Sequence, residues 1–439
     1  MRSCPLSPPL LMAMLCVVGC AAAPAPQLEH ALSEGQLGRA LGHYETAGQG
    51  RPEDLARIAD AVLERELGSA ESATRGRALA AVARTGNAAR PLLERLRTAS
   101  DLELRSAVLA QLVRLGDDAA RSSLRPLLDS GQASVLSAAV EALEAATAAD
   151  AARLRQLLDS PFAQVRLAAL GKLRHAAPVA SLRLALVELS HGDPEPRVAA
   201  AALSALANHG PAGFAAIEAA LERDSQPLRL AAIAALVRAD PQRAAELLVR
   251  YLQGDPSVEG LEVARHLQAG QGAALAPAAL AQVERALAAP DASLRARAAT
   301  VLPSFHLPAL DSPLAQAIAA RLKVESAPSI ELSLVLALPP SHALARRRLA
   351  KLSAGDGVVA VQAAAELARR GDRSGRRRLV ELARDDKPLL RSVALATLAR
   401  DLGLPHQARR GLLDKDSAVR IAVAAAILSG VRGTRREGS

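Results

Sequence analysis

The side chains most often used in catalysis and metal binding are few in this 439-residue sequence and lie far apart. Its nine histidines form no His-Glu-x-x-His motif and no pair at metal-ligand spacing. His191 and Asp193 make one loop pairing, which we interpret as a turn. A Gly-x-Ser-x-Gly motif and a phosphate-binding glycine loop are both absent from the sequence. The sequence therefore predicts no catalytic residue, no metal site and no cofactor.

Acidic and arginine side chains at a fixed spacing are the polar groups that recur. The stretch from Asp159 to Leu173 reads as a helix with an apolar face, and Asp159 is placed to cap it, with Pro161 near its first turn. Arg166 follows the apolar residue Val165. We expect such an arginine to bond a capping carboxylate of its own or the next repeat, which is a structural role. The arginines at this position are Arg75, Arg105, Arg166, Arg229, Arg295, Arg391 and Arg420.

A helical phrase with a period near thirty residues carries these arginines. Successive phrases lie 29 to 36 residues apart, and a second amphipathic segment lies between them. Helix, turn, helix at this period indicates a solenoid. Half of the residues are apolar but Trp is absent and Phe plus Tyr number five, which favours closely packed helices. Ten of the twelve anchors of the phrases are apolar, and Thr74 and Glu259 are weak anchors; in order they are Thr74, Leu104, Val135, Val165, Val198, Leu228, Glu259, Leu294, Ile330, Val359, Leu390 and Val419.

We therefore predict an all-α fold, a right-handed α-α superhelix of about twelve two-helix repeats. The repeats are expected over residues 52–430, after an N-terminal capping helix over 28–51 and before a basic disordered tail over 431–439. Two stretches, 252–277 and 303–313, lengthen the spacing and are rich in Gly or Pro. We expect them to be loops, either enlarged on a binding face or without function.

The phrase resembles the HEAT-like repeats of bacteria, of the type found in phycobilisome lyases, whose motif is Asp-Pro-x-x-x-Val-Arg-x-x-Ala-x-x-Ala-Leu. Asp159 to Arg166 matches it, and 193–198 and 416–420 match approximately. The resemblance implies the fold and leaves the chemistry open. An accessory subunit or a lyase-like enzyme therefore remains an alternative to a non-enzymatic protein. Arginine is replaced in the motif at Leu136, Ala199, Gly260, Glu331 and Ala360.

The N-terminus is typical of an export signal. Arg2 supplies a positive charge, and Leu10 to Val18 is an uncharged apolar run too short to span a bilayer. The run ends in Val-Val-Gly-Cys20, which resembles the lipobox of bacterial lipoproteins. This resemblance implies a signal peptide over 1–19, lipidation of Cys20 and a lipidated tether over 20–27. Cleavage near Ala21-Ala22-Ala23, giving a soluble periplasmic or secreted protein, is the alternative.

Export also limits the chemistry of the mature chain. The three cysteines are Cys4, Cys16 and Cys20, so a chain that starts at Cys20 has no disulfide framework. Ala21 after Cys20 resembles outer-membrane sorting, which implies a bacterial outer-membrane lipoprotein facing the periplasm. Export and the scarcity of aromatic side chains argue against nucleic-acid binding.

Positive charge gathers in the last quarter of the chain. Residues 341–439 carry 21 Lys plus Arg against 10 Asp plus Glu, while residues 1–340 carry 33 (54 − 21) against 35 (45 − 10). Such arginines either form a surface for an anionic partner or lie on an ordinary solvated helix face. The candidate patch consists of Arg346, Arg347, Arg348, Arg369, Arg370, Arg376, Arg377 and Arg378.

These features predict a lipid-anchored HEAT-repeat scaffold in the cell envelope that binds a protein partner on its concave surface. Its only membrane attachment is expected to be the N-terminal lipid. The alternatives are the lyase-like enzyme or accessory subunit and a binder of anionic lipid or polysaccharide through the C-terminal arginines.

Overall fold

The computed structural model describes residues 26–46, 51–174, 176, 179–269, 276–305 and 313–433, and within them every regular element is helical. The α-helices are α1 (Pro26–Ser33), α2 (Leu37–Thr46), α3 (Pro52–Leu67), α4 (Ser72–Thr85), α5 (Arg90–Leu96), α6 (Leu102–Arg114), α7 (Asp118–Leu124), α8 (Ala133–Ala139), α9 (Ala148–Leu157), α10 (Ala163–Leu173), α11 (Ala180–Gly192), α12 (Pro196–Leu206), α13 (Pro211–Leu221), α14 (Gln226–Ala239), α15 (Pro241–Gln253), α16 (Val258–Ala269), α17 (Ala276–Ala288), α18 (Ala292–Val301), α19 (Pro313–Val324), α20 (Pro328–Ala337), α21 (Ala343–Ala354), α22 (Gly357–Arg369), α23 (Arg373–Leu382), α24 (Pro388–Ala396), α25 (Pro405–Ala408) and α26 (Ser417–Gly433).

Short 3-10 helices and one π-helical turn extend several of these helices. They are η1 (Gly86–Ala89), η2 (Arg125–Asp129), η3 (Val140–Ala142), η4 (Ala207–His209), η6 (Leu302–Ser304), the π-helical η7 (Thr397–Asp401) and η8 (Arg409–Leu413).

Local sequence signals set where the helices begin. Proline occupies the first turn of several of them, as Pro52 does in α3, where its missing N–H costs no hydrogen bond. Aspartate caps others: the carboxylate of Asp101 accepts the backbone N–H of Leu104 (2.9 Å), and Asp240 accepts that of Arg243 (3.0 Å). Each cap satisfies a backbone donor that the first turn would otherwise leave unpaired.

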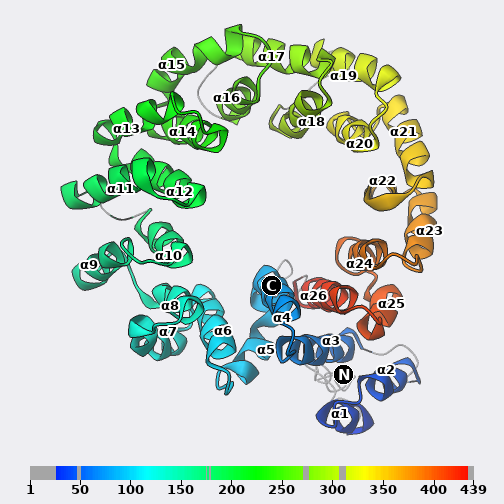
Figure 1. The fold of residues 1–439 in the computed structure, drawn as a ribbon. Coiled ribbons are helices and arrows are strands. Elements are labelled where there is room, and N and C mark those ends of the chain that lie inside the picture. Colours follow the sequence, from blue (N-terminus) through cyan, green and yellow to red (C-terminus); the bar gives the residue numbers. More distant parts are fainter. Residues whose placement is uncertain are drawn as a thin grey trace, which may run out of the picture.

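From α3 to α26 the described helices form twelve successive pairs, and the prediction of an all-α solenoid of about twelve two-helix repeats is confirmed. The anchor phrases fall in the second helix of each pair. Figure 1 shows these second helices, such as α16, α18 and α20, forming an inner layer, with α15, α17 and α19 outside them. Two-helix units stacked in this way fit a HEAT-like repeat protein.

The solenoid closes on itself. Figure 1 shows the repeats running around a ring until α26 lies beside α3, and α26 packs against both α3 and α4 of the first repeat. One apolar core cluster contains side chains from both ends, including Leu63 and Leu67 of α3 and Val423 and Ile427 of α26. The end faces that an open solenoid must cover with polar caps therefore cover each other here.

Polar contacts reinforce this seam between the last and first repeats. Arg432 donates to both carboxylate oxygens of buried Asp60 (3.1 and 2.7 Å) and to the carbonyl of Ala88 (2.7 Å). The hydroxyls of Thr74 and Ser417 lie 3.3 Å apart. Each of these contacts joins residues near opposite ends of the sequence, so it can form only when the ring is closed.

The N-terminal helices α1 and α2 lie outside the ring beside the seam (Figure 1). A single capping helix was predicted over 28–51, but Gly35 ends the first helix with a φ of 68° and a second one follows. The Tyr44 hydroxyl in α2 contacts Nδ1 of His406, and Arg409 donates to Glu45 (2.7 Å). These helices therefore bind the last repeat as well as the first.

At the other end, α26 continues to Gly433, three residues into the segment predicted as a tail. The ion pair of Arg432 with Asp60 and the burial of Val431 hold these residues in the helix. Residues 434–439 lie outside the described residues, as do the signal peptide over 1–19 and most of the tether over 20–27. Parts of the two stretches 252–277 and 303–313 also lie outside them.

A glycine sets how closely α22 and α23 approach. A Cβ added at Gly375 in α23 would lie 2.5 Å from the carbonyl oxygen of Ala364 and 2.6 Å from the backbone nitrogen of Ala368. Both atoms belong to the backbone of α22 and cannot turn away. We expect Gly375→Ala to destabilise the protein by about 1 to 3 kcal/mol through overpacking, measured as a lower midpoint of chemical unfolding.

The matched control for this substitution is Gly76→Ala in α4, where nothing lies within 4 Å of the added Cβ. Alanine has the higher helix propensity, so this change is expected to be neutral or to stabilise by up to about 1 kcal/mol. Equal midpoints for the two variants would show that α22 and α23 are not in close contact.

Candidate functional site

Five of the arginines at the repeated position make the same two bonds. Arg166 donates to both oxygens of Asp193 in the next repeat (2.8 Å each) and to the carbonyl of Ser160, six residues before it (2.8 Å). Each contact therefore joins two repeats and satisfies a carbonyl at the end of an outer helix. The other four are Arg229 to Glu259 (2.7 Å), Arg295 to Glu325 (2.9 Å), Arg391 to Asp414 (2.8 Å) and Arg420 to Glu66 (2.8 Å), with the carbonyls of Arg223, Ala289, Asp385 and Asp414.

The last of these contacts crosses the seam. Arg420 lies in the final repeat, and its partner Glu66 lies at the end of α3 in the first. Glu66 is 4% exposed. Burial alone would raise the pKa of Glu66, but hydrogen bonds from Arg420 and Arg65 outweigh it and lower the pKa. These arginine contacts between repeats, the arginine ladder, thus include one that joins the last repeat to the first.

Three of the named ladder residues behave differently. Arg75 donates to the carbonyl of Ser69 (3.0 Å) but pairs with no described carboxylate, and Arg105 has no side-chain partner among the described residues. Asp159 does not cap its helix: α10 begins at Ala163 with Phe162 at the cap, beyond Pro161. Asp159 instead lines a surface cavity beside Arg166.

In four of the five repeats whose motif lacks its arginine, an arginine from the following repeat bonds a backbone carbonyl instead. In the repeat with Ala199, Arg223 beyond the end of α13 donates to the carbonyl of Ser190 (3.0 Å) at the end of α11. It reaches back from the following outer helix. The repeats with Leu136, Gly260 and Ala360 have the same kind of bond. The donors and the carbonyls that accept are Arg153 to Leu128 (2.9 Å), Arg285 to Leu252 (2.9 Å) and Arg378 to Ser353 (3.0 Å).

At Gly260 the space left by the absent side chain is occupied by the side chain of Gln282. A Cβ there would lie 2.2 Å from Nε2 of Gln282, which donates to the carbonyl of Tyr251 (3.2 Å). At the fifth departure, Glu331 is itself an acidic group, and Arg348 donates to it (2.9 Å). An arginine bond between repeats is therefore present at all five departures, and sequence spacing alone did not indicate which arginines make it.

Glu325 is the most deeply buried of the carboxylates that pair with the ladder arginines. Its side chain is fully buried, and burial alone would raise its pKa. Hydrogen bonds from Arg295, from the backbone N–H of Ala327 and from Arg321 outweigh burial and lower the pKa to about 2. The carboxylate therefore stays ionised and paired at neutral pH.

This shift predicts a pH dependence. Because the folded-state pKa of Glu325 lies below its ordinary value of 4.5, its contribution to stability is complete above about pH 4.5 and is lost as pH falls towards 2. Unfolding midpoints measured between pH 5 and pH 2.5 should fall less steeply for Glu325→Gln than for the parent. Exposed Glu222→Gln should keep the parental slope; an unchanged slope in Glu325→Gln would contradict the assignment.

A second buried carboxylate lies in the inner layer. Glu262 of α16 accepts bonds from Arg265 and His266 of its own helix and from Arg297 of α18 (2.7 Å). Burial would raise the pKa of Glu262, but the His266 and Arg265 bonds lower it to about 2. A carboxylate ionised and paired in this way is a poor general acid or base near neutral pH.

The inner layer carries one groove in the first third of the chain. It has a volume of about 240 Å³ and is lined mainly by residues of α4, α6, α8 and α10, the second helices of successive repeats, with Leu93 of α5 and Glu141 of η3. Leu79, Val82 and Ala83 supply apolar surface. Ser134, Gln111 and Arg114 supply polar groups, with Arg114 bonded to Glu141 (3.0 Å).

The predicted arginine patch divides into two groups. Arg348, Arg370 and Arg378 bond protein groups, as does Arg369 with Glu366. Arg346 is 73% exposed and makes one long contact with Asp372 (3.5 Å). The exposed residues without a partner among the described residues are Arg347 in α21 and Arg376 and Arg377 in α23. These two outer helices pack side by side, so four of the eight residues remain as a charged surface.

Other predicted features lie outside what the structure describes. Cys20, the predicted lipidation site, is one of them. Among the described helices none is long and apolar enough to cross a membrane. The described side chains also include no group of three His, Cys, Asp or Glu placed to hold a metal ion.

Comparison with known proteins adds little to this picture. No family model matches the chain, and no curated protein matches it. Among solved structures the chain is similar to an engineered protein from a structural genomics programme (19% identity, 85% of this chain and 98% of that one, TM-score 0.24). It is also similar to a chain of the Pds5–Scc1 complex (14% identity, 79% of this chain and 61% of that one, TM-score 0.28). At these TM-scores neither likeness carries an argument, and the fold assignment rests on the helix pairs themselves.

Proposed function

We propose that this protein is a ring-shaped, lipid-anchored scaffold in the bacterial envelope, facing the periplasm, that binds an extended segment of a partner protein. The observation that carries the proposal is the groove across α4, α6 and α8 in the inner layer of the ring. It combines an apolar floor with hydroxyl, amide and guanidinium groups along successive helices. An extended peptide presents both apolar side chains and backbone donors and acceptors, so it matches such a surface.

Contacts between repeats and closure of the ring both favour a rigid binding surface. Contacts between repeats fix the relative position of the inner helices, and the seam removes the two free ends at which a solenoid frays. A preorganised groove loses less conformational entropy on binding than a flexible one. Closure of the ring at the seam therefore supports binding at the inner layer.

A blocking substitution tests the groove. Ala83 is exposed and lines it, so Ala83→Trp should fill it and abolish recovery of a stoichiometric partner by the tagged chain. Ala119→Trp, on exposed surface of outer helix α7, is the matched control and should keep the partner. Both variants should retain the parental far-ultraviolet circular dichroism. Equal recovery with both would contradict binding at the groove.

The anchor is tested separately at Cys20. Cells labelled with a clickable fatty acid should yield a labelled protein, and Cys20→Ala should abolish the label. An unlabelled parent, or a label that survives Cys20→Ala, would favour the soluble periplasmic or secreted alternative.

A second candidate function rests on Arg347, Arg376 and Arg377, which are exposed on adjacent outer helices. They could bind anionic lipid or polysaccharide, with a strong dependence on salt. Retention on a heparin or lipid A matrix should then be lost when Arg346 and these three are changed to Ala. Retention that persists would exclude the patch as its cause. The lyase-like alternative predicts a bound pigment or a small-molecule product instead of a protein partner.

A further inference from the structure

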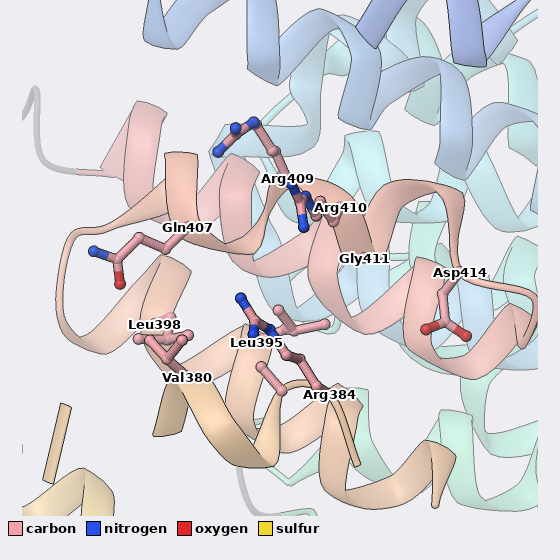
Figure 2. Close-up of a pocket in the computed structure, with 10 residues that line it drawn as sticks. Val380, Arg384, Leu395, Leu398, Gln407, Arg409, Arg410, Gly411 and Asp414 are labelled. Atoms are coloured by element: carbon pink, nitrogen blue, oxygen red, sulfur yellow. The ribbon is translucent and has the colours of Figure 1, made fainter. Parts of the chain in front are cut away.

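A cavity of about 390 Å³ lies between the last two repeats, away from the inner groove. Its walls come from the end of α23, from α24 with η7, and from α25 with η8 (Figure 2). Asp414, the partner of the ladder residue Arg391, also lines it. The cavity is large enough for a small organic molecule.

The charges in this cavity do not cancel. Asp414 is fully engaged by Arg391 (2.8 and 2.9 Å), and Arg409 is paired with Glu45 (2.7 Å). Arg384 and Arg410 also line the cavity, and neither has a side-chain partner among the described residues. Figure 2 shows them on opposite walls, Arg384 on the α23 side and Arg410 on the η8 side. Two guanidinium groups are thus left available to a ligand.

The rest of the lining is apolar. Leu395 and Leu398 are buried, and Val380 and Ala383 are half-buried beside them. The lack of a side chain at Gly411 lets η8 lie close to Leu395, because a Cβ at Gly411 would lie 2.8 Å from Leu395 and 2.7 Å from Val423. A ligand for this cavity therefore needs an anionic head for the two arginines and a small apolar body for the floor.

We propose that this cavity binds a small amphiphilic anion, with a phosphate or carboxylate head held between Arg384 and Arg410. Guanidinium groups bond both heads through paired N–H donors, and these bonds are stronger than neutral ones because both partners are charged. The head can come from a free metabolite or from a lipid. The inference is independent of partner binding at the inner groove.

Isothermal titration calorimetry of the full chain with hexyl phosphate tests the proposal. We expect saturable binding with one site per chain. Inorganic phosphate, which lacks the body, and hexanol, which lacks the head, should each bind at least about tenfold more weakly, since tenfold corresponds to about 1.4 kcal/mol. Equal affinity for inorganic phosphate would exclude the apolar floor from the site. No binding of hexyl phosphate or hexanoate would overturn the proposal.

Two double variants with equal charge separate the cavity from general attraction. Arg384→Ala with Arg410→Ala should weaken hexyl phosphate binding at least about tenfold. Arg376→Ala with Arg377→Ala removes the same charge from exposed positions of α23 outside the cavity and should leave the affinity unchanged. Ala383→Trp, which fills the cavity and retains both arginines, should also abolish binding. Equal losses in the two double variants would show nonspecific attraction and overturn the site.

Vesicles distinguish the two sources of the head. Sedimentation with phosphatidic acid vesicles, compared with phosphatidylcholine vesicles, that depends on Arg384 and Arg410 assigns the site to a lipid. Binding of hexyl phosphate without such sedimentation assigns it to a free anion, and both results support the site.

Discussion

Arg432→Met is expected to destabilise the protein by about 3 to 5 kcal/mol and to open the ring. Asp60 is 2% exposed, and Arg432 donates to both of its carboxylate oxygens. Removing the arginine leaves a buried carboxylate with its main partner gone, because the remaining contact with Arg95 is longer (3.8 Å). The bond to the Ala88 carbonyl is lost as well. Both losses fall on the seam, where α26 meets the first repeat.

Chemical unfolding followed by circular dichroism measures the stability of this variant, and small-angle scattering measures its shape. The midpoint should fall and the radius of gyration should rise. Arg84→Met, on the exposed side of α4 and without a side-chain partner among the described residues, is the control and should change stability by less than about 1 kcal/mol. A parental midpoint and radius for Arg432→Met would show that the seam does not depend on this pair.

Arg295→Met is expected to cost a similar amount, about 3 to 5 kcal/mol, within one continuous part of the ring. Arg295 is 8% exposed and bonds Glu325 (2.9 Å) and the carbonyls of Ala289 (3.0 Å) and Pro290 (2.6 Å). The substitution leaves Glu325 buried with only Arg321 and backbone N–H groups as partners. The unfolding midpoint should therefore fall steeply.

The double variant Arg295→Met with Glu325→Met distinguishes a lost ion pair from lost packing. Replacing both members of a buried pair by apolar side chains removes the unpaired charge, so the double variant should be more stable than Arg295→Met alone. It should remain below the parent, because the carbonyls of Ala289 and Pro290 still lack their donor. A double variant that is less stable than the single one would contradict this account.

The repeats could be predicted from the sequence because their signals are local. Apolar residues at helical spacing, proline in first turns and Asp caps recur with a period near thirty, and twelve anchors gave twelve pairs. The residues at which the helices begin were predicted less accurately. Asp159 was placed as a cap, whereas the chain enters α10 only at Ala163, and Arg166 takes Asp193 of the next repeat as its partner.

Ring closure could not be predicted, because it depends on small rotations that add up over twelve repeats. The bond from Arg420 of the last described repeat to Glu66 of the first became evident only in the structure. The substitute arginines, such as Arg223 and Arg285, come from the following outer helix and lie outside the motif, so spacing gave no signal for them.

The candidate sites were predicted unevenly. Charge counting located the arginine-rich quarter, but contacts reduce the patch to Arg346, Arg347, Arg376 and Arg377. The cavity between Arg384 and Arg410 joins side chains from two repeats, which single-sequence reading does not bring together.

The closed ring is tested most directly by a disulfide across the seam. The hydroxyls of Thr74 and Ser417 lie 3.3 Å apart although the residues are 343 positions apart in sequence. Thr74→Cys with Ser417→Cys, in a full chain whose native cysteines are replaced by serine, should oxidise to an intramolecular disulfide. The oxidised chain should show altered, reductant-sensitive electrophoretic mobility. Thr74→Cys with Ser293→Cys, across the ring, should not. A Thr74–Ser417 pair that stays reduced under the same oxidation would show that the solenoid is open.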